Sequence, residues 1–107
     1  MDKSVEGVFK FNDFIEYQSE SIVSKEILKT GKGTITLFAI DAGQGISEHS
    51  APFDVLVQII DGEAQIIISG KPHTVKSGES LIMPADKPHA LKAEKQFKML
   101  LVMIRRS

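Results

Sequence analysis

The chain has 107 residues, of which 42% are hydrophobic and 25% charged, which is typical of a small globular domain with a modest core. Thirteen lysines and arginines face fourteen aspartates and glutamates, so neither a nucleic acid nor a membrane surface is an expected partner. The lack of cysteine excludes disulfides and thiolate chemistry, and the lack of a signal-peptide pattern or a long apolar run makes a cytoplasmic location the expectation.

The whole chain, 1–107, is predicted to be a single domain with an N-terminal arm over residues 1–20 and a barrel over residues 21–107. Within the arm, residues 12–18 form the segment with helical character, because Asn12 can cap a helix and apolar side chains recur behind it. This helix of at most two turns is expected to pack as a lid or an edge cover.

Short segments rich in β-branched and aromatic residues alternate with turn signals through the rest of the chain. Strands are predicted over residues 21–28, 34–40, 55–60, 64–69, 73–76, 80–83, 89–93 and 97–104. Among the turn signals, Asp61-Gly62 is predicted to connect two of these strands. The spacing predicts an all-β sandwich or barrel.

The last predicted strand is apolar on both of its faces. One face carries Phe97, Met99, Leu101 and Met103, and the other carries Leu100, Val102 and Ile104. Because residues two apart on a strand point the same way, each face needs its own cover. The outer cover is expected to be a second sheet layer, the N-terminal segment or another subunit.

Two spaced patterns lie in order between Gly43 and Ala93. The first has its fixed points at Gly43, His49, Ala51, Val55 and Gly62. The second has its fixed points at Gly78, Pro84, Asp86, His89 and Ala93. The spacing of both resembles the two motifs of the cupin family, in which a His-x-His, a Glu and a later His stand at the corresponding positions.

The resemblance implies an all-β fold, the single-domain cupin double-stranded β-helix or jelly-roll barrel, here with a short N-terminal helix. It implies further that His49 and His89 face each other inside the barrel. Family members that keep three histidines and the glutamate hold a divalent metal there and leave positions open for substrate. Small cupins commonly dimerise, so a homodimer is also expected.

This chain departs from the family pattern at several positions. The second histidine is Ala51 and the glutamate is Val55, so only His49 and His89 remain as candidate metal ligands. Protein metal sites generally use three or four side chains. No cofactor is therefore certain, and a weakly held Zn, Fe, Mn or Ni ion completed by water is the remaining possibility. Asp54 precedes Val55 on the strand and is expected to point to the other face.

The replacements make the expected site more apolar. The predicted ligand-binding residues are His49, His89, Ala51, Phe53, Val55 and Met83. Such a pocket suits a small, partly hydrophobic molecule with an acidic or hydrogen-bonding group. His73 is expected to be packed or exposed at the rim, and Arg105-Arg106 to be a solvated tail.

Three functions stay open at this point, and catalytic residues are unknown under all of them. The first is a module that binds a small molecule with His49 and His89 as polar anchors. The second is a metal-dependent enzyme of the dioxygenase, isomerase or decarboxylase type. The third is a non-catalytic structural or regulatory dimer.

Overall fold

The structure is a computed structural model that describes residues 7–106. Eight strands follow one short helical turn in the order η1 (Phe11–Asp13), β1 (Ile22–Thr30), β2 (Gly33–Ile40), β3 (Gly45–His49), β4 (Phe53–Ile68), β5 (Lys71–Lys76), β6 (Ser80–Met83), β7 (His89–Lys92) and β8 (Phe97–Arg105). The predicted all-β fold is confirmed. No helix within residues 7–106 is long and apolar enough to cross a membrane.

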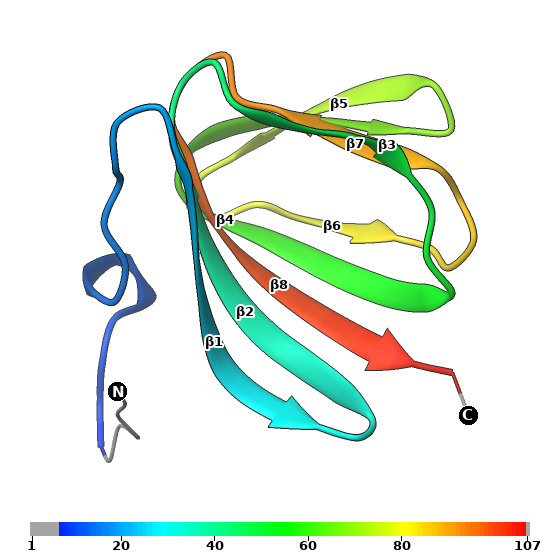
Figure 1. The fold of residues 1–107 in the computed structure, drawn as a ribbon, viewed down its shortest axis with the longest axis horizontal. Coiled ribbons are helices and arrows are strands. Elements are labelled where there is room, and N and C mark those ends of the chain that lie inside the picture. Colours follow the sequence, from blue (N-terminus) through cyan, green and yellow to red (C-terminus); the bar gives the residue numbers. More distant parts are fainter. Residues whose placement is uncertain (1–6, 107) are drawn as a thin grey trace.

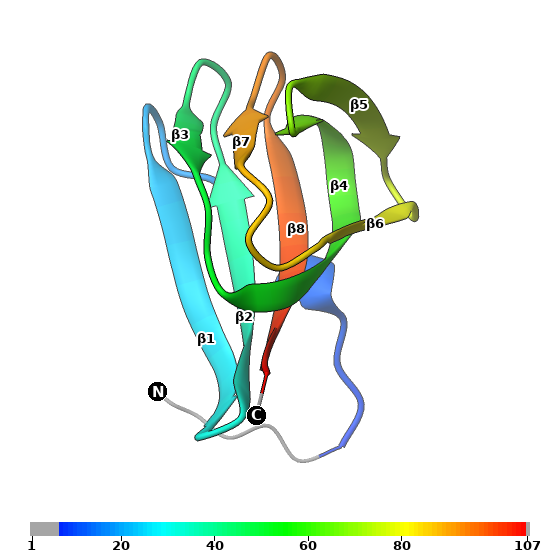
Figure 2. The same ribbon diagram turned by 90° about the vertical axis from the view of Figure 1, so that its right-hand side faces the viewer.

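All strand pairs are antiparallel and form one curled sheet with two walls. The first wall contains β1, β2, β8, the first part of β4 and β6. The second wall contains β3, β7, the last part of β4 and β5. Figure 1 shows the strands converging on the left and fanning out on the right, and Figure 2 looks into that open end.

The strand β4 runs through both walls, and this corrects the prediction of a turn at Asp61-Gly62. The pairing register with β8 shifts between Ile59 and Asp61, as in a β-bulge. Gly62 has a φ of 79°, and a Cβ there would lie 2.3 Å from the carbonyl oxygen of Gln96. A glycine with a positive φ occurs at bends within a strand as well as at turns. The dipeptide Asp61-Gly62 by itself therefore does not distinguish the two.

The other predicted strands are confirmed with their ends shifted by a few residues. The strand β3, by contrast, was absent from the predicted strands. Most of its side chains are exposed, so it lacks the apolar run that marks a strand in the sequence. Its pairing with β7 defines the strand.

The main core fills the space between the two walls. Its fully buried members come from four strands and include Ile40, Val57, Ile59, Ile66, Met83, Phe97 and Met99. On β8, the inward residues Phe97, Met99, Leu101 and Met103 contact this core, as the alternation predicted. The barrel is therefore filled by side chains over much of its depth.

The opposite face of the first wall carries a second apolar cluster, which the N-terminal segment covers. Ile15 is 2% exposed and packs with Leu37 and Ala39, and Leu100 of β8 packs against them. The N-terminal segment is thus one of the three covers that the sequence left open. The helix predicted over residues 12–18 is only the 3₁₀ turn Phe11–Asp13.

Candidate functional site

The two histidines of the motifs lie side by side at the open end of the barrel, where β3 ends and β7 begins. His49 and His89 are paired in register, and their ring centroids are 4.4 Å apart with the planes at 68°. His89 points inward, because Leu91 on the same face of β7 is a core residue. The open end is called the barrel mouth here and comprises His49, Phe53, His89 and Arg105.

Backbone carbonyls hold both imidazoles in the same way. Nδ1 of His49 lies 2.9 Å from the carbonyl oxygen of Ser47, and Nδ1 of His89 lies 3.1 Å from that of Lys87. A carbonyl oxygen only accepts hydrogen bonds, so Nδ1 of each ring is the donor. In the neutral form, Nε2 of each ring therefore keeps its lone pair and acts as an acceptor or a metal ligand.

His89 is only 6% exposed, whereas His49 is exposed. Burial lowers the pKa of His89 below its ordinary value, and the neighbouring His49 lowers it further, against the opposing effect of the Lys87 carbonyl. The buried ring is thus held toward its neutral form.

Two short loops complete the barrel mouth and are tied to each other. The amide of Asp86 donates to the carbonyl of Ala51 at 2.8 Å, and the amide of Ala85 donates to Oδ1 of Asp54 at 2.9 Å. Asp54 points away from the barrel interior, as predicted, since it pairs with Ile104 on the outer face. Its side chain therefore positions the loop that leads into His89.

The predicted apolar lining lies at two depths. Val55 and Met83 are paired in register and are 5% and 2% exposed, so they form a buried floor just below the barrel mouth. Phe53 and Ala51 are half-buried and lie nearer to the rim. The structure places these residues around one end of the barrel, and their contact with a ligand stays a prediction.

The donor atoms at the barrel mouth do not make a complete metal site. Within residues 7–106, no group of three or more histidine, cysteine, aspartate or glutamate side chains is placed to hold a metal ion. Ala51 and Val55 provide no ligand atom, and Asp54 faces outward. Two imidazoles fall short of the three or four side chains that protein sites use.

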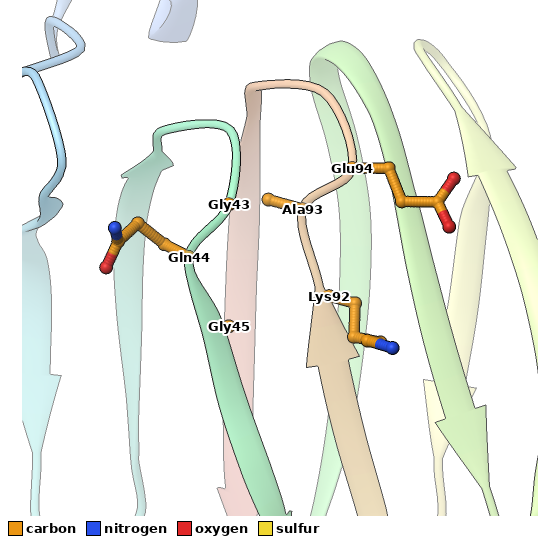
Figure 3. A pocket seen from close by; sticks show the side chains of 6 residues that line it. All are labelled: Gly43, Gln44, Gly45, Lys92, Ala93 and Glu94. Atoms are coloured by element: carbon orange, nitrogen blue, oxygen red, sulfur yellow. The ribbon is translucent and has the colours of Figure 1, made fainter.

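The other sequence features lie away from the histidine pair. His73 is exposed on β5, in agreement with the rim position that was one of its two expectations. A hollow of about 310 Å³ lies at the opposite ends of β3 and β7 (Figure 3). Its lining residues are Gly43, Gln44, Gly45, Lys92, Ala93 and Glu94. It contains neither histidine.

The barrel mouth also includes Arg105, which was expected in a solvated tail. Arg105 is exposed, as expected, but it is the last residue of β8 and pairs with Phe53 of β4. Its Cζ lies 5.2 Å from the centroid of the Phe53 ring. The signal was present, because Arg105 continues the alternation of Leu101 and Met103 on the inward face.

Comparisons with known proteins agree with this architecture. The model of the Cupin domain family matches residues 36–105, and no curated protein matches the chain. A conserved protein of unknown function from Streptococcus pyogenes is 33% identical, with 98% of this chain and 94% of that chain covered and a TM-score of 0.91.

Two further solved structures are described as cupins. A cupin 2 conserved barrel domain protein from Leptotrichia buccalis is 40% identical with a TM-score of 0.88, and the match covers 91% of this chain but 47% of that chain. The chain therefore spans about half of that relative. A cupin superfamily protein from Desulfitobacterium hafniense is 26% identical with a TM-score of 0.90, with 95% of this chain and 94% of that chain covered. With its eight-stranded barrel, its paired histidines and a family match over more than half of its length, the chain belongs to the cupin family.

Proposed function

We propose that the barrel mouth binds a small organic molecule, with His49 and His89 as its polar anchors. The observation that carries this proposal is the edge-to-face histidine pair, whose Nδ1 atoms are both occupied by backbone carbonyls. Two Nε2 acceptors therefore remain for a ligand above the apolar floor of Val55 and Met83. Few polar groups over an apolar floor are typical of small-molecule sites.

The size of the ligand is limited by the packing of the barrel. Val57, Ile59 and Met99 are fully buried, so the space below Val55 and Met83 is occupied by the core. The ligand is therefore expected to lie near the rim, between the histidine pair and Phe53. A molecule of one ring or a short aliphatic chain suits this depth.

Nuclear magnetic resonance of the imidazole nitrogens tests the proposal with a panel of small acids, amides and alcohols. Binding at the barrel mouth is expected to shift the Nε2 resonances of His49 and His89 and not those of His73. The variants His49→Gln and His89→Gln are expected to lose binding, whereas the exposed His73→Gln serves as the matched control. Shifts that survive in His89→Gln would refute the assignment of the site.

A second candidate function is a cupin enzyme of the dioxygenase, isomerase or decarboxylase type, and it is favoured by the two Nε2 lone pairs. Backbone contacts that fix the Nδ1 proton are common behind metal-binding imidazoles. Elemental analysis of protein purified without chelators, and again after exposure to Zn, Fe, Mn or Ni, tests this function. Occupancy near zero in every case contradicts it.

We further propose that the partner of this chain is a second copy, which docks on the outer face of the first wall. Five strands place apolar residues there in one register, called the outer row: Ile82, Leu56, Val102, Ile35 and Leu28. Ile82 is 62% exposed and Leu28 is 61% exposed, and Ile104 beside the row is 57% exposed.

The area and charge of the outer row favour a second copy as its partner. These side chains form one apolar strip across five strands, and a standard interface buries about 800 Å² of each partner. The row carries no charge, and a two-fold axis would place it against its own copy. The neighbouring row that carries Leu37 and Leu100 is already covered by the N-terminal segment, whereas the outer row is left uncovered by residues 7–106.

A further inference from the structure

Arg105 is exposed at the end of β8 and lies on the face of the strand that points into the barrel. Its register partner is Phe53, and its inward neighbours along the strand are Met103 and Leu101. The guanidinium lies over the Phe53 ring, with Cζ 5.2 Å from the ring centroid. A cation–π contact of this kind restrains the guanidinium beside the ring, and a guanidinium carries five N–H donors.

The neighbouring Arg106 has a carboxylate partner, which Arg105 lacks within residues 7–106. Arg106 points to the outer face, where its Nη2 and Nε lie 3.2 and 3.3 Å from the two carboxylate oxygens of Asp54. Within residues 7–106, the Asp54 carboxylate pairs with Arg106 and not with Arg105. The two adjacent arginines therefore have different partners. Arg106 pairs with a carboxylate of the protein, and Arg105 contacts an aromatic ring at the barrel mouth.

Among residues 7–106, Arg105 makes no ion pair with a carboxylate. Glu26 and Lys29 also share the inner face of the first wall, but both lie on the edge strand β1. Two strand spacings, about 10 Å, separate β1 from β8. Arg105 is thus the permanent positive charge beside Phe53. The histidine pair differs from it, because an imidazole that donates from Nδ1 to a carbonyl offers, in its neutral form, an acceptor at Nε2, which does not suit a carboxylate.

We infer that the molecule bound at the barrel mouth is a small organic acid, whose carboxylate is bound by Arg105 and whose apolar body lies against Phe53. The inference rests on the proposed ligand binding at the barrel mouth and adds the chemical class of the ligand. A planar guanidinium donates two parallel hydrogen bonds to a carboxylate, so a carboxylate fits it better than a neutral amide of the same shape. The histidine pair then accepts a hydrogen bond from another group of the acid.

Matched pairs of acids and amides test the charge without changing the shape. Benzoate against benzamide and propionate against propionamide are titrated into the protein, and dissociation constants are read from the amide resonances of the barrel mouth. In the unaltered protein, each acid is expected to bind at least about tenfold more tightly than its amide. In Arg105→Gln the ratio is expected to fall to near one.

Two variants control for fold and for net charge. Arg106→Gln removes the same charge from the adjacent position on the outer face, and it is expected to keep the preference for acids. Arg105→Lys keeps a point charge and is expected to retain part of the preference for acids over amides. This variant keeps the test valid even if Arg105→Gln does not fold.

The outcomes separate the two proposals. Equal binding of acid and amide, with binding lost in His89→Gln, overturns the role of Arg105 and leaves the proposed function standing. An equal loss of preference in Arg105→Gln and Arg106→Gln also overturns it, because net charge then explains the effect. Binding of neither the acids nor the amides contradicts the proposed function, and the inference falls with it.

Discussion

His89 shows at the scale of one residue how burial and a polar role compete. Its ring is 6% exposed, and burial lowers its pKa, while its Nδ1 contact with the Lys87 carbonyl opposes that shift. The unfolded chain takes up a proton near the ordinary histidine pKa of about 6.5, and the folded chain does so at a lower pH. Between these two values the unfolded state binds more protons, so stability rises with pH in that window.

The stability of the protein is therefore expected to fall as the pH drops below about 6.5 and through the lower pKa of folded His89. In His89→Gln this part of the pH dependence is expected to disappear. Urea unfolding between pH 7.5 and pH 5 measures both, with His73→Gln as the exposed control. An unchanged pH dependence in His89→Gln would show that His89 does not carry it.

Gly62 is a second residue whose role is set by its surroundings. Its φ of 79° lies in the left-handed region, and an added Cβ would meet the Gln96 carbonyl oxygen at 2.3 Å. Gly70 has a similar φ of 81° but has nothing within 4 Å of such a Cβ. Comparing substitutions at Gly62 and Gly70 therefore separates the free-energy cost of the backbone conformation from the cost of the close contact.

Gly62→Ala is expected to destabilise the fold by about 3 kcal/mol or more, because β4 and the Gln96 backbone must move apart. Gly70→Ala is expected to cost only about 1 kcal/mol, from its φ alone. The free energy of unfolding in urea measures both. Equal losses in the two variants would mean that the contact at Gly62 relaxes without cost.

At the scale of the element, the N-terminal segment is held by a polar network as well as by Ile15. Lys98 of β8 is 6% exposed, and its Nζ donates to the carbonyl and to Oδ1 of Asn12 at 2.7 and 2.9 Å. The hydroxyl of Tyr17 donates to Asp61 at 2.6 Å, and burial with this hydrogen bond raises the pKa of Tyr17. The Asn12 side chain is therefore an anchor and not the predicted helix cap.

Lys98→Met is expected to destabilise the protein by about 1–3 kcal/mol, because the Asn12 carbonyl loses its donor in a half-buried place. Lys25→Met is the matched control, since the exposed Lys25 donates to the Phe14 carbonyl at 2.8 Å and its loss is expected to cost less than about 1 kcal/mol. Hydrogen exchange of residues 11–17 is expected to accelerate in Lys98→Met alone. Equal protection in both variants would argue against the anchor.

At the scale of the whole molecule, the outer row is an apolar feature that residues 7–106 leave uncovered. It crosses five strands, which places its ends roughly 20 Å apart. Burial of such a surface against a second copy would stabilise a chain of 107 residues whose own core is modest.

Light scattering at micromolar concentration is expected to give twice the chain mass of 11.8 kDa. Ile82→Lys places a charge in the outer row, and it is expected to shift the protein toward the monomer. His73→Lys adds the same charge on the other wall and is expected to leave the dimer intact. A monomer in the unaltered protein contradicts the proposed partner.

The sequence by itself determined the all-β fold, the family and the two faces of β8. Alternation along Phe97–Arg105 and the spacing of His49 and His89 are local patterns that survive in any correct fold. The same alternation also implies that Arg105 points inward, although the predicted strand over residues 97–104 ends one residue before it.

Only the tertiary structure decided the features that depend on partners distant in sequence. The bend of β4 at Gly62 is set by its pairing with β8, and the strand β3 exists through its pairing with β7. The cation–π contact of Arg105 with Phe53 joins residues 52 positions apart, and the N-terminal turn is hydrogen-bonded to Lys98. A local pattern carries the preferences of one segment, whereas these features come from contacts that form only when the walls of the barrel meet.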